Sequence, residues 1–253
     1  MCLLVFAWHS HPEFPLVFAG NRDELHARPS QSAGFWEDSP KVLAGRDLQA
    51  GGTWLGITTQ GRFAVVTNYR DGLHPVSGRR SRGQLTSDFL QSDVSPQAYA
   101  QRVETQRDDY AGFSLLVGDR SALWYVTNRG NGAQPVTPGI HGLSNHLLDT
   151  PWPKVTRTAE RLKLLLDAGH LGNHTLLKLL KDRSPAPATD LPDTGIGPEL
   201  EHKISAPFVV NDRYGTRCST LILMGTHGAR FTERCFAPDG RALETRYFLI
   251  EDN

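Results

Sequence analysis

Apolar residues occur along this chain in short unbroken runs in which β-branched and aromatic residues dominate. Gly, Pro, Asn or Asp bound most of the runs, a pattern typical of β-strands that end in turns. We therefore predict strands at 3–8, 15–20, 53–59, 62–68, 112–118, 122–128, 207–210, 219–225, 229–236 and 244–250. Because the runs do not alternate with polar residues, we expect many strands to be covered on both faces.

Helical spacing of apolar residues is found in the middle of the chain. It is present in residues 81–91 and after Ser95-Pro96, where a capping serine precedes a proline at the first helical position. The same spacing recurs at Lys154–Leu166 and Asn173–Leu180. The helices are therefore expected to lie between two sets of strands in the sequence.

Strands at both ends of the chain with helices between them fit two packed sheets with helices outside. This predicts an α+β fold, a four-layer αββα sandwich of two mostly antiparallel sheets; one sheet with helices on one side is the alternative. With 253 residues, 39% of them hydrophobic, the chain can bury one substantial core. We expect a single domain over residues 1–253, and read the Pro- and Gly-rich residues 184–199 as a surface excursion or lid.

Composition and charge exclude several classes of function. Lys and Arg number 27, as do Asp and Glu, and no basic run is interleaved with aromatic residues, so nucleic acid is not an expected partner. The apolar start is too short to span a bilayer and no leader cleavage site follows, which predicts a cytoplasmic protein without a transmembrane segment. Three cysteines without CxxC spacing fit a reducing compartment. We expect neither a metal nor a cofactor.

The thiol at position 2 is the first candidate for chemistry. The initiator methionine is usually removed before a small second residue, which would leave Cys2 with a free α-amine. The amine titrates at about 8 and the thiol at about 8.5, so the amine can take the proton of the thiol at neutral pH. The alternative is that Cys2 is only a small apolar residue at the start of a buried strand.

A hairpin of the first two predicted strands would bring a carboxylate to this thiol. With a turn through the HPEF segment, the numbers of paired residues add to about 25, which places Cys2 opposite Asp23. Asn21 and Asp23 then share one face and serve the side of the thiol, while Arg22 points to the other face. The alternative for Arg22, Asp23 and Glu24 is a solvated turn.

Several blocks of sequence together resemble the NRDE family, the relatives of the transport and Golgi organisation protein 2. They follow in the order of that family over nearly the whole chain and are AGNRDELHARPS, GGTWLGIT, VTNYR, SRGQL, GLSNHLLDTPWPK, YGTRCSTLILM and FTER. That family in turn resembles N-terminal nucleophile hydrolases of the penicillin V acylase and bile salt hydrolase type, which have an αββα sandwich and a processed N-terminal cysteine. The resemblance places Cys2 at the nucleophile position.

The same resemblance implies roles for other residues. Asp23 takes the place of the orienting carboxylate and Asn21 precedes it by two residues, as an asparagine does in those hydrolases, but Gly20 stands where they carry an arginine. Asn68 and Asn145 look like the residues that form the oxyanion hole, where amide donors stabilise developing negative charge. A turn residue is the alternative for Asn68, and a cap for Asn145.

Arg217 resembles the arginine that closes those hydrolase sites; otherwise it is a solvated residue at the end of a strand. The glycines before Trp54 predict a tight turn or a close backbone approach beside that ring. The predicted catalytic residues are Cys2, Asp23, Asn68 and Asn145, and the predicted substrate-binding residues are Asn21, Arg22, Trp54 and Arg217.

Three functions compete on these observations. The first is a cysteine N-terminal nucleophile amidohydrolase or acyltransferase that acts on a small amide or acyl substrate. The second, which the resemblance implies, is a non-enzymatic lipid or haem carrier or chaperone, with Cys2, His74, His141 or His146 as candidate haem ligands. The third is an interaction protein, favoured if Met1 is retained. The mass of the intact protein after native expression separates the first from the third.

Overall fold

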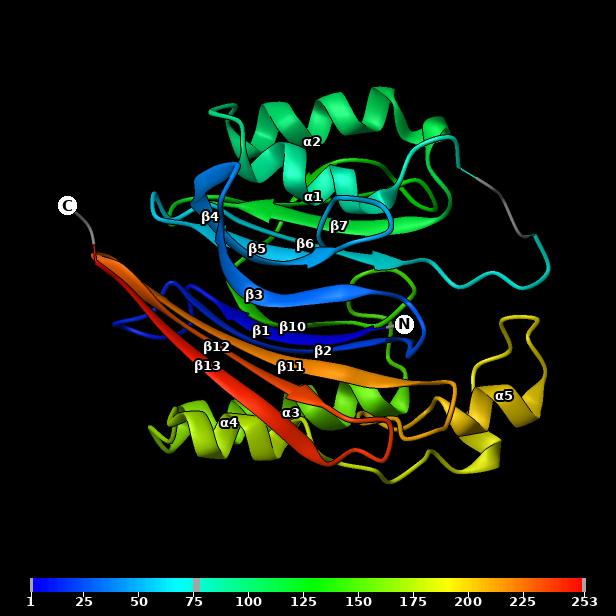
Figure 1. Cartoon of the computed structure of the whole chain (residues 1–253). Coiled ribbons are helices and arrows are strands. Elements are labelled where there is room, and N and C mark those ends of the chain that lie inside the picture. The colour runs from blue at the N-terminus through cyan, green and yellow to red at the C-terminus, as the bar shows by residue number, and fades with distance from the viewer. Residues whose placement is uncertain (1, 75–77, 252–253) are drawn as a thin grey trace.

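The computed structural model describes residues 2–74 and 78–251 and shows two sheets packed face to face (Figure 1). The six-stranded sheet has the order β10 (Gly139–Leu143), β1 (Cys2–Trp8), β2 (Leu16–Leu25), β11 (Tyr214–Gly225), β12 (Gly228–Phe236) and β13 (Ala242–Glu251). The seven-stranded sheet has the order β3 (Ser30–Trp36), β4 (Ser39–Asp47), β5 (Leu55–Thr58), β6 (Phe63–Asn68), β7 (Phe113–Gly118), β8 (Leu123–Thr127) and β9 (Gln134–Pro135). Neighbouring strands in both sheets run antiparallel.

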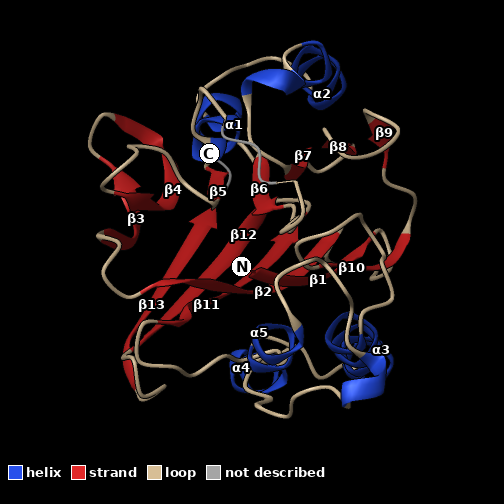
Figure 2. Cartoon of the chain, turned by 90° about the vertical axis from the view of Figure 1, so that its right-hand side faces the viewer, coloured by secondary structure: helices blue, strands red, loops and turns tan. Residues whose placement is uncertain are grey.

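Helices cover the outer face of each sheet, as Figures 1 and 2 show from two directions. On the seven-stranded sheet lie α1 (Arg82–Leu90) and α2 (Pro96–Thr105). On the six-stranded sheet lie α3 (Pro153–Asp167) and α4 (Asn173–Leu179), and α5 (Pro198–Lys203) follows on the same side. The order helix, sheet, sheet, helix confirms the predicted α+β fold, a four-layer αββα sandwich.

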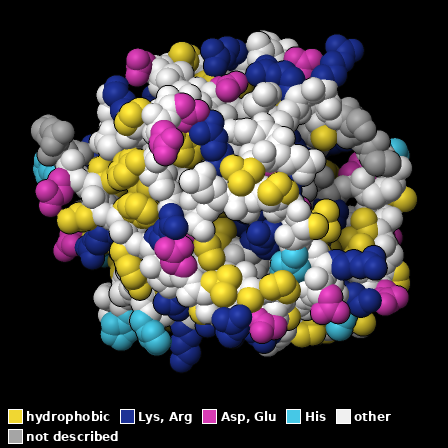
Figure 3. Space-filling model, in the orientation of Figure 1, with side chains coloured by type: hydrophobic (Ala, Val, Ile, Leu, Met, Phe, Trp, Pro, Cys, Tyr) yellow, Lys and Arg dark blue, Asp and Glu magenta, His cyan; other side chains and the backbone are white. Residues whose placement is uncertain are grey.

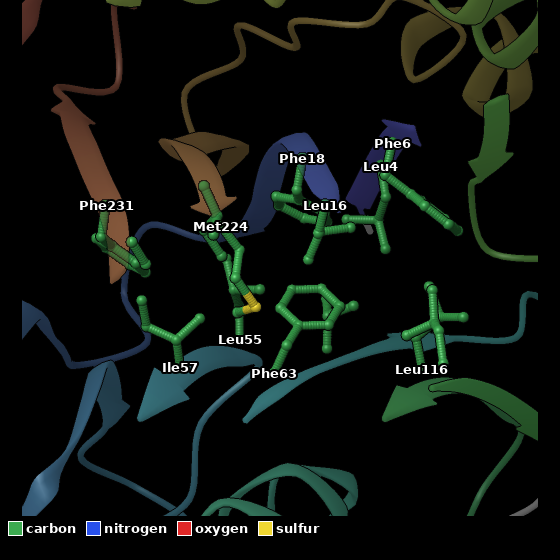
Figure 4. Close-up of a cluster of buried hydrophobic side chains, with 14 of the residues drawn as sticks. Leu4, Phe6, Leu16, Phe18, Leu55, Ile57, Phe63, Leu116, Met224 and Phe231 are labelled. Carbon is green, nitrogen blue, oxygen red and sulfur yellow. The ribbon is translucent and has the colours of Figure 1, made fainter. Parts of the chain in front are cut away.

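Large apolar side chains from the two sheets fill much of the space between them (Figure 4). The six-stranded sheet contributes Leu4, Phe6, Leu16, Phe18, Met224 and Phe231, and the seven-stranded sheet contributes Leu55, Ile57, Phe63 and Leu116. The rings of Phe18 and Phe63 meet across the interface with their centroids 5.4 Å apart. Because each sheet also packs against helices, its central strands are apolar on both faces, as the unbroken runs predict.

The helix boundaries follow the capping residues that the sequence shows. The hydroxyl of Ser81 accepts a hydrogen bond from the backbone N–H of Gly83 at the start of α1. The hydroxyl of Ser95 does the same for Ala98 at the start of α2, where Pro96 occupies the first helical position. All four predicted helices are present, and the short helix α5 is an addition.

The predicted strands differ from the structure where polar residues take part. β2 continues to Leu25, so the charged residues after Gly20 belong to a strand, and the alternative of a solvated turn is wrong for the buried Arg22 and Asp23. The predicted strand at 207–210 is wrong as well. Its backbone bonds elsewhere: the N–H of Phe208 reaches a carbonyl in the loop after α4, and the N–H of Val209 reaches a threonine hydroxyl.

The surface mixes charges of both signs, and Figure 3 shows basic and acidic side chains interspersed on one face of the molecule. This matches the equal numbers of basic and acidic residues in the chain. Within residues 2–74 and 78–251, no helix has the length and apolar character needed to cross a membrane.

Candidate functional site

Cys2 begins β1 and lies in the six-stranded sheet beside β2, with its side chain on the face that is turned toward the other sheet. Leu4, Phe6 and Trp8 follow on the same face, because alternate residues of a strand point the same way. At the end of the sheet where Cys2 lies, the apolar packing gives way to a cavity of about 360 Å³. Cys2 therefore combines a largely buried position with access to a cavity.

The register of the first hairpin differs by one residue from the prediction. Cys2 pairs with Arg22, and Leu3 pairs with Asn21. The seven-residue connection between β1 and β2 is not one of the short turns that specify a register, so the sequence left this shift open. Since paired residues on neighbouring strands point to the same face, Arg22 shares the face of Cys2. The expectation that Arg22 points away from the thiol is wrong.

Arg22 is 6% exposed and lines the cavity beside Cys2. Its guanidinium lies over the ring of Trp54 at 4.2 Å from the centroid, and its Nη2 is 3.7 Å from a carboxylate oxygen of Glu24. Gly20 precedes it on the same face, where an added Cβ would lie 2.9 Å from the Phe18 ring. Arg22 therefore brings a positive charge to the face of Cys2, two residues beyond Gly20 on β2.

Asn21 points to the opposite face of β2, toward the helices. Its Nδ2 donates to the carbonyl oxygens of Leu180 at 2.9 Å and Pro207 at 2.8 Å, and its Oδ1 accepts from Ser219 at 2.6 Å. The side chain thus connects the sheet to two loops and does not line the 360 Å³ cavity. This placement corrects the predicted substrate-binding role of Asn21.

Asp23 follows Arg22, the residue that pairs with Cys2, so its side chain points to the opposite face of β2. Asp23 nevertheless lines the cavity. Burial raises the pKa of its carboxyl group, while the Lys154 ammonium, a hydrogen bond of 2.7 Å from the Thr216 hydroxyl and the Arg22 charge lower it. The negative charge of Asp23 in turn raises the pKa of the Cys2 thiol. The carboxylate and the thiol are electrostatic neighbours.

Lys154 is a buried cation that the sequence analysis did not select. It lies in the first turn of α3, is 3% exposed, and donates from Nζ to the carbonyl oxygen of Ile204 at 3.0 Å. Burial lowers its pKa to about 8, against the opposing charge of Asp23. Lys154 ends the GLSNHLLDTPWPK block and begins a predicted amphipathic helix. Its position on the apolar face of that helix is the feature of the sequence that could have indicated a buried lysine.

Asn145 connects the two sheets beside the thiol. Its Oδ1 accepts a hydrogen bond of 3.2 Å from the backbone N–H of Cys2, and its Nδ2 donates to the carbonyl oxygen of Asn68 at 3.1 Å. The residue has a φ of 54°, a left-handed conformation that asparagine tolerates better than most residues. Asn68 ends β6 and lines the same cavity. The structure thus brings both predicted asparagines to Cys2 from different elements.

Trp54 lies between the sheets, where close backbone approaches make room for it. An added Cβ on Gly45 would lie 2.3 Å from the Trp54 ring, and one on Gly52 would lie 2.5 Å from the backbone of Gly83. The backbone N–H of Thr53 also donates to the carbonyl of Gly83 at 3.3 Å. These contacts confirm the prediction of close backbone approach in the GGTW segment and place Trp54 in the cavity wall.

Arg217 does not line the cavity among the described residues. It lies at an irregular point of β11, where the pairing with β2 shifts register. Its Nη1 donates to the carbonyl oxygens of Leu25 at 2.9 Å, His26 at 3.3 Å and Arg28 at 3.1 Å. The guanidinium therefore holds the turn between β2 and β3, which corrects its predicted place in the substrate site.

The cavity wall contains further charged residues that sequence reasoning missed. Arg28, Asp47, Arg80 and Arg82 line it, and Arg82 is the first residue of α1. Burial lowers the pKa of Arg82, and the charges of Glu24 and Cys2 act in the opposite direction. The SRGQL block contains Arg82, but the segment was read only as a helix, because a basic residue at a helix start is unremarkable in sequence.

The three thiols differ in their surroundings. Burial raises the pKa of Cys2, and Asp23 adds to this effect, whereas Arg22 and the Asp23 backbone amide act against it. Cys218 and Cys235 are free thiols that lie opposite each other on the neighbouring strands β11 and β12. Burial holds the pKa of Cys218 well above its usual range and raises that of Cys235 to about 11, and the charge of Glu233 raises both further. Of the three thiols, Cys2 is the one that lines the cavity.

The histidines named as candidate haem ligands lie away from the cavity lining. His141 has both ring nitrogens engaged, at 2.7 Å from Asp149 and 2.9 Å from the carbonyl of Thr137. His146 lies between two hydroxyl groups at 2.7 and 2.8 Å, and the exposed His74 is paired with a carboxylate at 3.3 Å. In the part of the chain that the structure describes, no group of three or more His, Cys, Asp and Glu side chains is placed to hold a metal ion.

Solved structures share this architecture. An N-acylethanolamine-hydrolyzing acid amidase ortholog of Caenorhabditis elegans aligns with a TM-score of 0.50 and 10% identity, over 88% of this chain and 92% of the amidase. A mutant conjugated bile acid hydrolase of Clostridium perfringens aligns with a TM-score of 0.51 and 7% identity, over 99% of this chain and 92% of the hydrolase. The chain thus has the fold of N-terminal nucleophile hydrolases.

Sequence comparison is more specific. The family described as Transport and Golgi organisation 2 matches residues 1–238. The Transport and Golgi organization protein 2 homologs of Bos taurus and Homo sapiens are 37% and 36% identical to this chain, over 92% of the chain and 92% of each relative. The chain belongs to the Transport and Golgi organisation 2 family, which confirms the resemblance found in its sequence blocks.

Proposed function

We propose that this protein is a cysteine amidohydrolase or acyltransferase whose nucleophile is Cys2, acting on a small amide or acyl substrate. The proposal requires removal of Met1, which lies outside the described residues. The observation that supports it is that the Cys2 thiol and the Arg22 guanidinium line one cavity, while the buried Asn145 amide accepts a hydrogen bond from the Cys2 nitrogen. A residue that served only to fill the core would need neither the charge nor the cavity.

The chemical steps follow the proximity of thiol and amine. The sulfur of Cys2 bonds to the carbonyl carbon, its proton passes through the α-amine to the leaving amine, and the carbon–nitrogen bond breaks to leave a thioester. Water, or an acceptor amine in a transferase, then attacks the thioester and releases the thiol. Because burial raises the pKa of the thiol, little thiolate exists at neutral pH, and a base beside the sulfur is required.

Two residues are positioned to hold that base. The Oδ1 of Asn145 accepts a hydrogen bond from the Cys2 nitrogen at 3.2 Å, a contact that the free amine would retain. Asp23 would stabilise the ammonium form through its negative charge, as the third member of other nucleophilic sites does. In this scheme Asp23 is a positioning residue, because its hydrogen bond to Thr216 fixes its own orientation.

Oxyanion stabilisation is assigned in this proposal to the two asparagines. The Nδ2 of Asn145 carries two hydrogens, and its bond to the carbonyl of Asn68 uses one of them. In this scheme the second would donate to a developing oxyanion, and Asn68 at the cavity end of β6 would supply another donor. Side-chain amides suit this role because they donate without adding a net charge.

A lipid or haem carrier has less support. The cavity wall is dominated by charged and small polar residues, whereas an acyl chain or a porphyrin needs a mainly apolar lining. Both ring nitrogens of His141 and of His146 already have protein partners. Haem ligation by either residue would therefore break existing hydrogen bonds.

The test compares the three thiols in the intact protein. Mass spectrometry first establishes that Met1 is removed. Iodoacetamide at neutral pH should then label Cys2 faster than Cys218 or Cys235, since Cys2 faces the cavity and the other thiols have strongly raised pKa values. Asp23→Asn should slow the labelling of Cys2 without unfolding the protein, because in this proposal the loss of the charge that orients the α-amine outweighs the fall in the thiol pKa that the same change causes.

Activity is measured on a panel of small amides and thioesters. Cys2→Ala should abolish turnover and Cys2→Ser should greatly reduce it, while the matched Cys218→Ala variant should retain it. The proposal fails if processed protein carries a Cys2 no more reactive than a free peptide thiol and the Cys2→Ala variant keeps every activity. Binding of haem or an acyl chain that survives in that variant would favour the carrier, and retention of Met1 would favour an interaction protein.

A further inference from the structure

The cavity beside Cys2 carries an excess of positive charge. Four arginines line it, namely Arg22, Arg28, Arg80 and Arg82, against the three carboxylates of Asp23, Glu24 and Asp47. Two of these arginines have close carboxylate partners, since Arg28 lies 2.7 Å from Asp47 and Arg80 lies 3.2 Å from Asp88, whereas the ion pair of Arg22 with Glu24 is longer, at 3.7 Å. The excess is therefore concentrated on Arg22 and Arg82.

Arg22 has a buried donor without an acceptor. Its Nη1 makes no hydrogen bond, although the side chain is 6% exposed and lines the cavity. The ring of Trp54 covers one face of the guanidinium, and the contact of Nη2 with Glu24, at 3.7 Å, exceeds hydrogen-bond length. An unsatisfied buried donor costs free energy that an acceptor would recover, so this atom is suited to a ligand acceptor.

Arg82 lines the same cavity from α1, which packs on the seven-stranded sheet. Its Nη1 donates to the carbonyl of Gly112 at 3.1 Å, and within residues 2–74 and 78–251 no carboxylate lies at ion-pair distance from it. Arg82 also begins α1, and Gly83 of the same helix end lines the cavity. The positive end of the helix thus adds to the charge of the side chain.

The position of these groups near the thiol limits where a negative charge can lie. Arg22 is the direct cross-strand partner of Cys2, which brings their Cβ atoms to about 4.5–5.5 Å. The charge of Cys2 also acts on Arg82. An anion bound between the two guanidinium groups would therefore lie only a few bonds from a carbonyl at the sulfur of Cys2.

We propose that the substrate carries a carboxylate close to its scissile carbonyl, and that Arg22 and Arg82 bind this carboxylate. The inference rests on the proposed function of Cys2 and specifies its substrate class. A carboxylate fits better than a phosphate dianion, because the lining arginines exceed the lining carboxylates by one and Glu24 acts on Arg82. Arginine binds carboxylates in a planar, two-bond geometry that also fixes orientation.

Turnover provides the first arm of the test. Succinyl 4-nitroanilide and its neutral succinamide analogue differ only by carboxylate and carboxamide. The value of kcat/KM should be about 10–100 times higher for the carboxylate, as expected for charge-assisted hydrogen bonds of about 1.5–3 kcal/mol. Arg82→Gln should bring this ratio close to one. Arg80→Gln is the matched control and should keep the ratio, because Arg80 is paired with Asp88.

Binding provides a second arm that does not depend on catalysis. Calorimetry of the Cys2→Ala protein with the same two probes should show preferred binding of the carboxylate, lost in the Cys2→Ala, Arg82→Gln double variant. Arg82 is half-buried, so this change is better tolerated than a change of the buried Arg22. Selective binding without turnover in the wild type would keep the carboxylate site and reject the catalytic proposal. Turnover or binding with no preference for the carboxylate, or no measurable binding of either probe, would overturn the inference.

Discussion

Toward one end of the space between the sheets, the rings of Phe18 and Phe63 are in contact and neighbouring side chains fill the interior (Figure 4). Toward the other end, Cys2 and Arg22 face a cavity of about 360 Å³. Both ends are built on the same face of β2, which changes from apolar to charged after Gly20. One strand face therefore serves two purposes.

The difference shows which end holds the fold together. Buried apolar side chains stabilise the protein in proportion to the area removed from water. A buried guanidinium with an unpaired N–H contributes little or nothing to stability, since desolvation offsets its attractions. Buried residues that do not stabilise the fold are expected mainly at binding and catalytic sites. The following predictions separate the two ends by stability.

Phe63→Ala should give the largest effect, because the ring is fully buried against Phe18. We expect a loss of about 3–5 kcal/mol in the free energy of unfolding. Urea denaturation followed by tryptophan fluorescence measures it. Phe63→Leu is the control and should lose less, since it leaves a smaller void. A loss below about 1 kcal/mol for Phe63→Ala would show that the apolar end does not dominate stability.

Asn145→Ala should follow, since this side chain bridges Cys2 and Asn68 at the charged end. Loss of two hydrogen bonds and the strain of alanine at a φ of 54° together should cost about 2–3 kcal/mol. Asn145→Gly removes the same bonds but accepts the backbone conformation, so it should be about 1 kcal/mol more stable than the alanine variant. Equal stabilities of the two variants would contradict the role of the backbone.

Lys154 makes the charged end sensitive to pH. The pKa of Lys154 is about 8 in the folded protein and 10.5 ordinarily. Between these values the unfolded chain holds a proton that the folded protein does not, so the contribution of Lys154 to the free energy of unfolding should rise as pH increases from 8 to 10.5, while the raised pKa values of the three thiols act in the opposite direction. Below pH 8 the folded protein carries the full cost of burying the charge.

Lys154→Met should therefore stabilise the protein below pH 8 by about 1–2 kcal/mol, after allowance for the lost hydrogen bond to Ile204. The gain in stability of the variant over the wild type should shrink as pH rises from 8 toward 10.5, because the wild type then no longer carries the cost of burying the charge. Urea denaturation at a series of pH values tests both points. Parallel curves for the variant and the wild type would show that Lys154 is not the titrating group.

Arg22→Met should have the smallest effect on stability, although it removes a buried charge. The methionine side chain can still cover Trp54, and Glu24, which is 29% exposed, stays hydrated without its partner. We expect a change within about 1 kcal/mol in the free energy of unfolding. A loss above about 2 kcal/mol would mean that Arg22 is part of the stabilising core and would remove the contrast between the two ends.

The two ends also differ in how far the sequence predicts them. The apolar end follows directly from unbroken runs such as residues 3–8 and 219–225, because burial on both faces leaves a clear pattern. The edge strand β3 and its neighbour β4 were missed, since β3 is largely polar and β4 begins with Ser39-Pro40. The helices were predicted from the spacing of their apolar residues and, for α2, from the capping Ser95 before Pro96.

Only some members of the charged end were predicted, and its geometry was not. Cys2 was selected from its position in the sequence, and Asn68 and Asn145 through the family resemblance, and the structure places the three residues together. The face of Arg22 was missed because a shift of one residue in a hairpin exchanges the two faces of a strand. Arg82 and Lys154 were missed because their burial arises from packing between distant segments, which no local pattern records.

The central position of β2 has a consequence for how the protein is made. β2 pairs on one side with β11, so the bond from Ser219 to Asn21 joins residues 198 positions apart. At synthesis rates of about 5–20 residues per second, the first hairpin waits roughly 10–40 s for this partner strand, with its apolar faces uncovered. Such distant pairings also slow folding itself. We expect the nascent chain to depend on chaperones during this interval, and the cavity beside Cys2 to form only after translation is nearly complete.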